Sequence, residues 1–170
     1  MILSFNDKSP IIPKSCYISE SSDLIGDVTL GEDVSIWFGT VIRGDMHSIY
    51  IGNGTNIQDN STIHVTTNVS KTSIGDNVTI GHNAIIHGST IEDQCLIGMG
   101  SILMDNAYIG QGSIIGAGSL IPPDTIIPPQ SLVIGVPGKI IRKTNSTEIK
   151  MIIDRAKDYV KVSKKYQKQS

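Results

Sequence analysis

Three of the four histidines lie at positions from which they could share one metal ion. His64 falls in the segment "STIHV", and His82 and His87 lie close together in "IGHNAIIHG". Three neutral imidazoles with one open coordination position form the ligand set of a catalytic zinc site. Such a site generates hydroxide, a strong nucleophile, at neutral pH. The fourth histidine, His47, lies outside the repeat described below, and we expect it to face solvent.

Aliphatic residues recur every six positions along most of the chain. The recurring positions are Ile12, Ile18, Leu24, Leu30, Ile36, Ile42, Ile51, Ile57, Ile63, Ile74, Ile80, Ile86, Ile91, Ile97, Leu103, Ile109, Ile115, Ile121, Ile127 and Val133, with short interruptions between some of them. A period of six matches neither an α-helix nor an alternating strand, but it fits a short strand followed by a tight turn. Three such hexads make one coil of a triangular prism with inward aliphatic side chains. We therefore predict an all-β solenoid, a parallel β-helix of hexapeptide repeats, over residues 1–143.

Counting hexads around the prism places two of the candidate ligands on one face. His64 and His87 each directly follow a core isoleucine of this face and lie one coil apart, so we expect them to stack. Arg43 follows Ile42 on the same face, one coil before His64.

The third candidate ligand, His82, falls near a different corner of the prism. It lies two positions after Ile80, and Asp59 occupies the equivalent place one coil earlier, beside Gln58. His82 should therefore not reach the metal of its own chain. If the three histidines share one ion, a neighbouring chain must supply His82. Such a contact joins two different surfaces and has to close into a ring, which predicts a homotrimer with the sites at its interfaces.

Composition narrows the class of protein. The 170 residues carry a formal net charge of -2, which gives no electrostatic case for binding nucleic acid or an acidic membrane. No apolar run approaches the length of a membrane span, and we expect a soluble cytoplasmic protein. The two cysteines, Cys16 and Cys95, occupy small-residue positions of the hexads, so we expect them to pack in the interior.

The last part of the chain has a helical pattern and forms a second predicted unit, residues 144–170. Its apolar residues fall on one helical face: Ile149, Ile152, Ile153, Ala156, Tyr159 and Val160. Asn145, followed three positions later by Glu148, is a typical helix start. We expect this helix to lie back along the prism and to turn its lysines to solvent.

Several motifs together resemble the γ-class carbonic anhydrase family of hexapeptide-repeat proteins. They are "VIRGD" (41–45), "TNIQDNSTIHV" (55–65), "IGHNAIIHG" (80–88) and "VIGVPGKIIR" (133–142), and the resemblance covers nearly the whole chain. It implies a left-handed β-helix, a homotrimer and a metal at each interface, bound by His64 and His87 of one chain and His82 of its neighbour. Zinc is the usual metal of the family, with Fe²⁺ or Co²⁺ as alternatives. The implied reaction is the reversible hydration of CO2 to bicarbonate by a metal-bound hydroxide.

The resemblance also implies roles for four other residues. Arg43 and Asp59 resemble the ion pair that joins neighbouring subunits in this family, and Asp45 resembles a second structural acid. Gln58 resembles the residue that orients the metal-bound water. We expect the two aspartates and the arginine to act mainly by holding the trimer together.

One departure from the family bears on the rate. The prototype carries glutamates in a loop beside the site, and one of them shuttles protons. Here the loop after His64 reads "VTTNVSKTS" and contains no acid. Rapid turnover requires the proton of the metal-bound water to leave, so we expect weak CO2 hydration or a different natural substrate.

Two other functions are compatible with the same repeat. Hexapeptide acyltransferases that use acetyl-CoA share the prism and the trimer but generally depend on one histidine as a general base. A non-catalytic relative, of the kind labelled ferripyochelin-binding protein, would keep the site for binding or assembly. The trio of histidines favours the metal enzyme over both alternatives.

Overall fold

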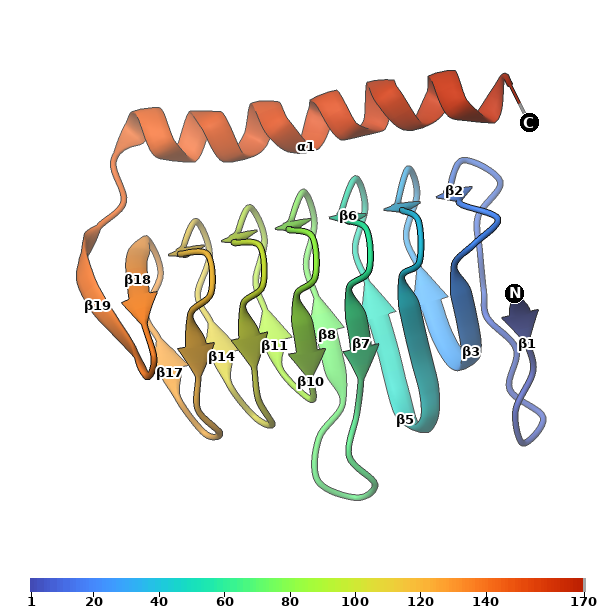
Figure 1. Ribbon diagram of the computed structural model, residues 1–170, viewed down its shortest axis with the longest axis horizontal. Coiled ribbons are helices and arrows are strands. Elements are labelled where there is room, and N and C mark those ends of the chain that lie inside the picture. Colours follow the sequence, from blue (N-terminus) through green and yellow to red (C-terminus); the bar gives the residue numbers. More distant parts are fainter. Residues whose placement is uncertain (170) are drawn as a thin grey trace.

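The computed structural model, in which residues 1–169 are described, is a parallel β-solenoid with one long helix along its side (Figure 1). The larger sheet contains β1 (Ile2–Leu3), β3 (Asp23–Leu30), β5 (Val41–Ile51), β7 (Thr62–His64), β8 (Thr72–Ile74), β10 (Ile85–His87), β11 (Thr90–Ile91), β13 (Ile102–Leu103), β14 (Tyr108–Ile109), β16 (Leu120–Ile121) and β17 (Ile126–Ile127). The second sheet contains β2 (Tyr17–Ile18), β4 (Ser35–Ile36), β6 (Asn56–Ile57), β9 (Thr79–Ile80), β12 (Leu96–Ile97), β15 (Ile114–Ile115), β18 (Ser131–Gly135) and β19 (Gly138–Lys143). The predicted β-helix is confirmed.

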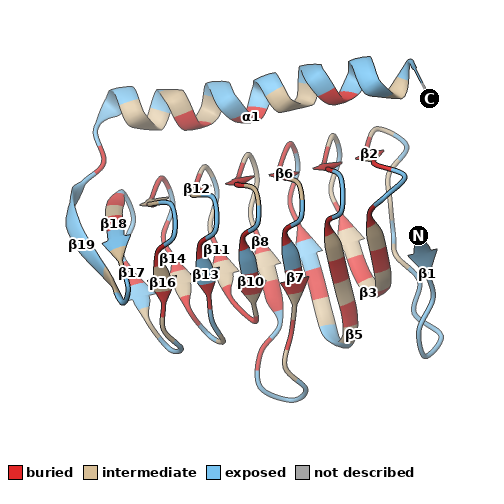
Figure 2. Cartoon of the chain, in the orientation of Figure 1, coloured by how far each residue is buried: buried red, intermediate tan, exposed pale blue. Residues whose placement is uncertain are grey.

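The hexad aliphatics form in-register ladders that fill the interior of the prism. Along one ladder, Ile42 pairs with Ile63, Ile63 with Ile86, Ile86 with Leu103 and Leu103 with Ile121. All of these side chains are fully buried, and Figure 2 shows the same alternation of buried and exposed residues in coil after coil. Burial of each such side chain contributes about 1.5–3 kcal/mol, so the repeat itself supplies the core.

The corners of the prism depend on two further features of each hexad. The residue three places after most core aliphatics has a positive φ, as in Asn60, Asn77 and Asn83, and asparagine or glycine adopts this conformation at low cost. Several small hydroxyl residues at the corners are buried and form hydrogen bonds: Ser61 donates to the carbonyl of Gly81, and Ser101 donates to that of Gly116. Each coil is thereby tied to the next one.

The segment between Ile42 and Ile51, where the six-residue spacing is interrupted, forms one continuous strand. β5 runs over 11 residues and turns the corner between two faces of the prism. It can do so because β3 follows the same path beside it, with a register shift between Gly26 and Val28. His47 lies within β5 and is exposed, as expected.

Helix α1 (Ser146–Gln167) lies along the coils and covers the sheet that contains β2, β4, β6 and β9 (Figure 1). Asn145 is its N-cap and forms a reciprocal capping box with Glu148, as predicted. Ile152, Ala156 and Ser163 are its buried residues. Among residues 1–169, no helix combines the length and the apolar character that crossing a membrane would require.

Both cysteines are buried in the prism, as predicted. Cys16 donates to the carbonyl of Gly31, and Cys95 donates to that of Gly110. Burial raises the pKa of Cys95 to about 12 and that of Cys16 to about 11. Both thiols are therefore protonated at neutral pH.

Candidate metal centre

His64 and His87 lie side by side on one face of the prism. They end β7 and β10, and the two strands pair so that His64 is directly opposite His87. The Nδ1 atom of His64 faces the Nε2 atom of His87 at 3.2 Å. The stacking predicted from the hexad count is confirmed for this pair.

The far nitrogen of each ring contacts a carboxylate. His64 Nε2 lies 3.0 Å from Asp45 Oδ1, and His87 Nδ1 lies 3.1 Å from Asp105 Oδ1. An ionised carboxylate can only accept a hydrogen bond, so these far nitrogens carry the protons. The facing nitrogens of His64 and His87 then both present lone pairs to the space between them.

This arrangement fits a metal ion. Two lone pairs at 3.2 Å repel each other unless a cation or a proton lies between them. Two nitrogens bound to a tetrahedral zinc ion at about 2.0–2.1 Å would lie about 3.3 Å apart. A carboxylate on the far nitrogen of a ligand histidine is also the usual support of a protein metal site.

The two carboxylates are held in their ionised form. Burial opposes ionisation of Asp45, but hydrogen bonds from Arg43 and His64 outweigh it and lower the pKa of this carboxyl. Burial likewise opposes ionisation of Asp105, and hydrogen bonds from Ser70, Thr66 and His87 lower its pKa. Both groups therefore remain acceptors at neutral pH.

Asp105 also belongs to this site and was not predicted from the sequence. It lies two positions after Leu103, on the same face as His87 and one coil later, so the hexad count itself could have identified it. The loop between β7 and β8 holds this carboxylate: Thr66 Oγ1 donates to it at 3.1 Å, and Ser70 Oγ also donates to it. The loop that lacks an acid thus contributes hydroxyl groups to the surroundings of His87.

His82 lies at a different edge of the prism, in the turn after β9. Its Nδ1 atom is 2.8 Å from Asp59 Oδ2, which leaves its Nε2 atom available, and its side chain is 40% exposed. Within residues 1–169, no group of three or more histidine, cysteine or acidic side chains is placed to hold a metal ion. A site with all three histidines therefore needs a second chain.

The remaining predicted site residues lie in two groups around the histidines. Arg43 donates to Asp45, so it supports the carboxylate that contacts His64. Gln58 is buried, and its amide donates to Asn56 Oδ1 at 3.2 Å. Gln58 and His82 line the same cavity. Arg43 and Asp59 have different partners within the chain, so contact between them would also require a neighbour.

Two hexapeptide-repeat family models match the chain. One is described as bacterial transferase hexapeptide (six repeats) and matches residues 88–123; the other is described as hexapeptide repeat of succinyl-transferase and matches residues 71–104. A crystal structure from Bacillus cereus, provisionally named an acetyltransferase, superimposes with a TM-score of 0.97 at 40% identity and covers 99% of this chain and 98% of that one. These matches establish the repeat and the fold.

Curated relatives point to one branch of the hexapeptide-repeat proteins. The carbonic anhydrase of Geobacillus kaustophilus is 44% identical over 98% of this chain and 91% of its own length. The mitochondrial γ carbonic anhydrase 2 of Arabidopsis thaliana is 41% identical over 95% of this chain, which spans 60% of the plant protein. The chain belongs to the γ-class carbonic anhydrase-like family of hexapeptide-repeat proteins.

Proposed function

We propose that this protein catalyses the reversible hydration of CO2 to bicarbonate at metal sites shared between the chains of a homotrimer. His64 and His87 of one chain and His82 of the next would hold each ion. The observation that carries the proposal is the pair of facing nitrogens of His64 and His87, each on a ring fixed by a carboxylate. Relatives named carbonic anhydrase over nearly the full length of this chain support the same reaction.

Zinc suits three imidazole ligands best, with Fe²⁺ and Co²⁺ as alternatives. When bound, such an ion lowers the pKa of water toward neutrality and so supplies hydroxide for attack on CO2.

Five other residues of the site would position the ligand histidines and the reacting water. Asp45, Asp105 and Asp59 would each accept a hydrogen bond from one ligand histidine and so fix the nitrogen that faces the metal. Gln58 would orient the reacting water through its amide. Arg43 would hold Asp45 in place and pair with Asp59 of the neighbouring chain.

The composition of the loop between β7 and β8 is consistent with slow proton transfer. Its hydroxyls from Thr66 and Ser70 are engaged with Asp105, and it carries no acid that could pass a proton to buffer. We therefore propose weak hydration activity that depends strongly on added buffer.

The acyltransferase alternative is not better supported, since the relatives aligned over most of their own length include carbonic anhydrases.

The first test is the His82→Ala substitution, with His47→Ala as the matched control. Removing one of three ligands should abolish metal binding and CO2 hydration, whereas the His47 side chain is exposed and accepts a hydrogen bond from the backbone N–H of Ser48. Elemental analysis of the purified protein, together with its mass in solution, should give about one metal ion per chain of a trimer for the unaltered protein and for His47→Ala. Full metal content in His82→Ala would refute the shared site.

A further inference from the structure

Two hydroxyl groups of the loop between β7 and β8 hold the carboxylate that contacts His87. Thr66 Oγ1 donates to Asp105 Oδ1 at 3.1 Å and to Oδ2 at 3.2 Å, and Ser70 Oγ also donates to Oδ1. His87 Nδ1 lies 3.1 Å from the same Oδ1 atom. The loop hydroxyls therefore fix the direction in which the carboxylate presents this oxygen to the histidine ring.

The loop is folded so that these hydroxyls turn inward. It extends beyond the edge of the coils (Figure 1), and the backbone N–H groups of Val69 and Ser70 both donate to the carbonyl of Thr66 at 3.2 Å. Ser70 is only 5% exposed, whereas Thr67 and Val69 at the tip of the loop face solvent. A buried hydroxyl is costly without a hydrogen-bond partner, so the loop depends on Asp105 as much as Asp105 depends on the loop.

Gly88 leaves the space in which the hydroxyl and the carboxylate meet. It directly follows the ligand His87, and its φ is +59°. A Cβ atom at this position would overlap both Ser70 Oγ and Asp105 Oδ1. The backbone N–H of Gly88 also donates to the carbonyl of His64 at 3.1 Å. The contact between the loop and the carboxylate is thus built into the end of the strand that carries His87.

We propose that Thr66 and Ser70 are positioning residues for His87 and act on it through Asp105. The contacts run from the two hydroxyls to the carboxylate, from the carboxylate to Nδ1 of the ring, and leave Nε2 facing His64. Without the hydroxyls the carboxylate could turn away, and Nδ1 would lose its acceptor. The consequence for metal affinity rests on the function proposed above. Because coupling is reciprocal, metal binding should in turn hold the loop in place.

The double variant Thr66→Val, Ser70→Ala removes both hydroxyls with little change in shape. We expect it to bind zinc about tenfold more weakly in competition with a chromophoric chelator, because partners beyond the direct ligands contribute about 10–100-fold to metal affinity. Thr67→Val is the matched control, since Thr67 lies in the same loop and is exposed, and it should bind zinc as the unaltered protein does. Equal zinc affinity of the double variant and this control would overturn the proposal.

The Asp105→Ala background separates positioning from a general loss of structure. If the hydroxyls act through the carboxylate, the double substitution should weaken zinc binding when Asp105 is present and cause no further loss in Asp105→Ala. Equal losses of zinc affinity in both backgrounds would mean that the loop does not act through Asp105 and would overturn the proposal.

The metal-free protein gives a second measurement, which does not depend on any bound ion. The NMR chemical shift of the His87 Nδ1 nitrogen distinguishes a protonated from an unprotonated ring nitrogen. We expect the protonated value in the unaltered protein and in Thr67→Val, because the carboxylate of Asp105 accepts from this atom. In the double variant at Thr66 and Ser70 the shift should move toward the unprotonated value. An unchanged shift would overturn the proposal.

Failure of the proposed enzymatic function would be visible separately. A protein whose His87 shift depends on the two hydroxyls, but which binds no zinc and hydrates no CO2, would refute the metal enzyme and retain the positioning role. A protein that binds zinc and hydrates CO2, while its double variant matches Thr67→Val in both measurements, would retain the enzyme and refute the positioning role.

Discussion

Each candidate ligand histidine contacts one aspartate through the ring nitrogen that does not face the proposed metal. His64 contacts Asp45, His82 contacts Asp59 and His87 contacts Asp105, at 2.8–3.1 Å. The same chemical pattern on three separate rings is typical of histidine ligands of a divalent cation, because the carboxylate fixes the tautomer and makes the ring a better donor.

Asp105 provides the sharpest test of this pattern. Its replacement by asparagine keeps the shape, but the amide can also donate, so it no longer fixes which nitrogen of His87 carries the proton. We expect Asp105→Asn to weaken metal binding by about 10–100-fold. Competition with a chromophoric zinc chelator measures this affinity.

Asp124→Asn is the control for that substitution. Asp124 is an exposed turn residue that accepts from Asn106 at 3.1 Å and contacts no histidine, so its loss should leave metal affinity unchanged. If Asp105→Asn binds zinc as tightly as Asp124→Asn does, Asp105 does not position His87.

The two thiols should be unreactive in the folded protein. Burial raises the pKa of Cys95 to about 12 and of Cys16 to about 11, against about 8.5 in an unfolded chain. Because only the thiolate reacts, iodoacetamide at pH 8 should label neither cysteine in the native protein and both in denaturant, as read from the intact mass. Rapid labelling of Cys95 under native conditions would contradict its burial.

The same shifts give a pH dependence of stability. A group whose pKa is raised by folding stabilises the protein fully below its unfolded pKa. This contribution is lost as the pH rises from about 8.5, where unfolded thiols ionise, through the folded values of about 11 and 12. Alkaline destabilisation over this range should be smaller in Cys95→Ala than in the unaltered protein.

At the scale of elements, α1 is fixed to the coils by its buried face and by a well-formed start. The Asn145 side chain accepts from the backbone N–H of Glu148 at 2.9 Å, and the Glu148 side chain accepts from the backbone N–H of Asn145 at 2.9 Å.

Asn145→Ala removes one of these hydrogen bonds and should lower the free energy of unfolding by about 1 kcal/mol. Asn145→Asp, which keeps an acceptor at the cap, is the control and should change it little. Urea denaturation followed by circular dichroism measures the difference. Equal stability of both variants would show that packing of the buried face alone determines whether α1 forms.

At the scale of the whole molecule, the proposed site is divided between chains. His64 and His87 lie on one face and His82 at another edge, and no metal-binding trio forms within residues 1–169. Two inactive variants should therefore complement each other when their chains assemble together.

His64→Ala and His82→Ala chains, refolded as a mixture, should regain part of the metal binding and of the CO2 hydration that each lacks alone. An interface in which His64 and His87 come from the His82→Ala chain, and His82 from the His64→Ala chain, has all three ligands. Mixing His64→Ala with His87→Ala is the control, because both lesions lie on the same side of the interface and no complete site forms. Equal recovery in both mixtures would argue against a shared site.

The sequence by itself determined the architecture and the relative position of the histidines. In a solenoid each hexad advances the chain by one face, so the position of Ile63 or Ile86 in the repeat is also its place in space, and the stacking of His64 on His87 follows from counting. The helix and its N-cap could also be predicted, because the capping box depends only on Asn145 and Glu148, which are three positions apart in the sequence.

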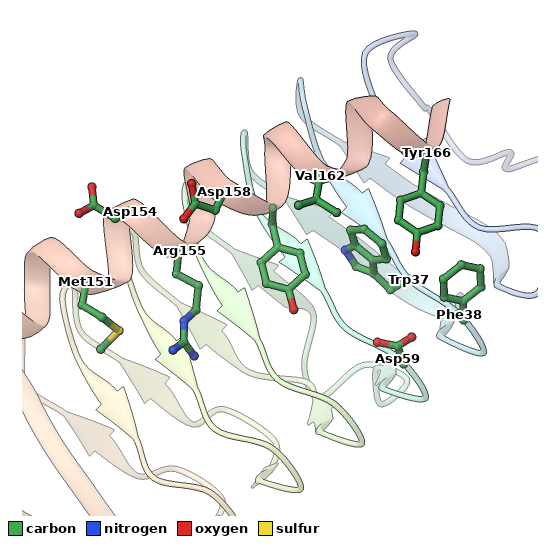
Figure 3. A pocket seen from close by; sticks show the side chains of 10 residues that line it. Trp37, Phe38, Asp59, Met151, Asp154, Arg155, Asp158, Val162 and Tyr166 are labelled. Atoms are coloured by element: carbon green, nitrogen blue, oxygen red, sulfur yellow. The ribbon is translucent and has the colours of Figure 1, made fainter. Parts of the chain in front are cut away.

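Only the tertiary structure decided how the histidines are supported and what lies beneath α1. The contacts of Asp105 with His87, Thr66 and Ser70 join a strand end, a long loop and the next coil, and no local pattern encodes the conformation of that loop. The continuous strand β5 depends on pairing with β3, and the cavity lined by Trp37 and Tyr159 (Figure 3) depends on where α1 lies across the coils. These features arise from contacts between segments distant in the sequence, whereas the repeat specifies only what recurs in every coil.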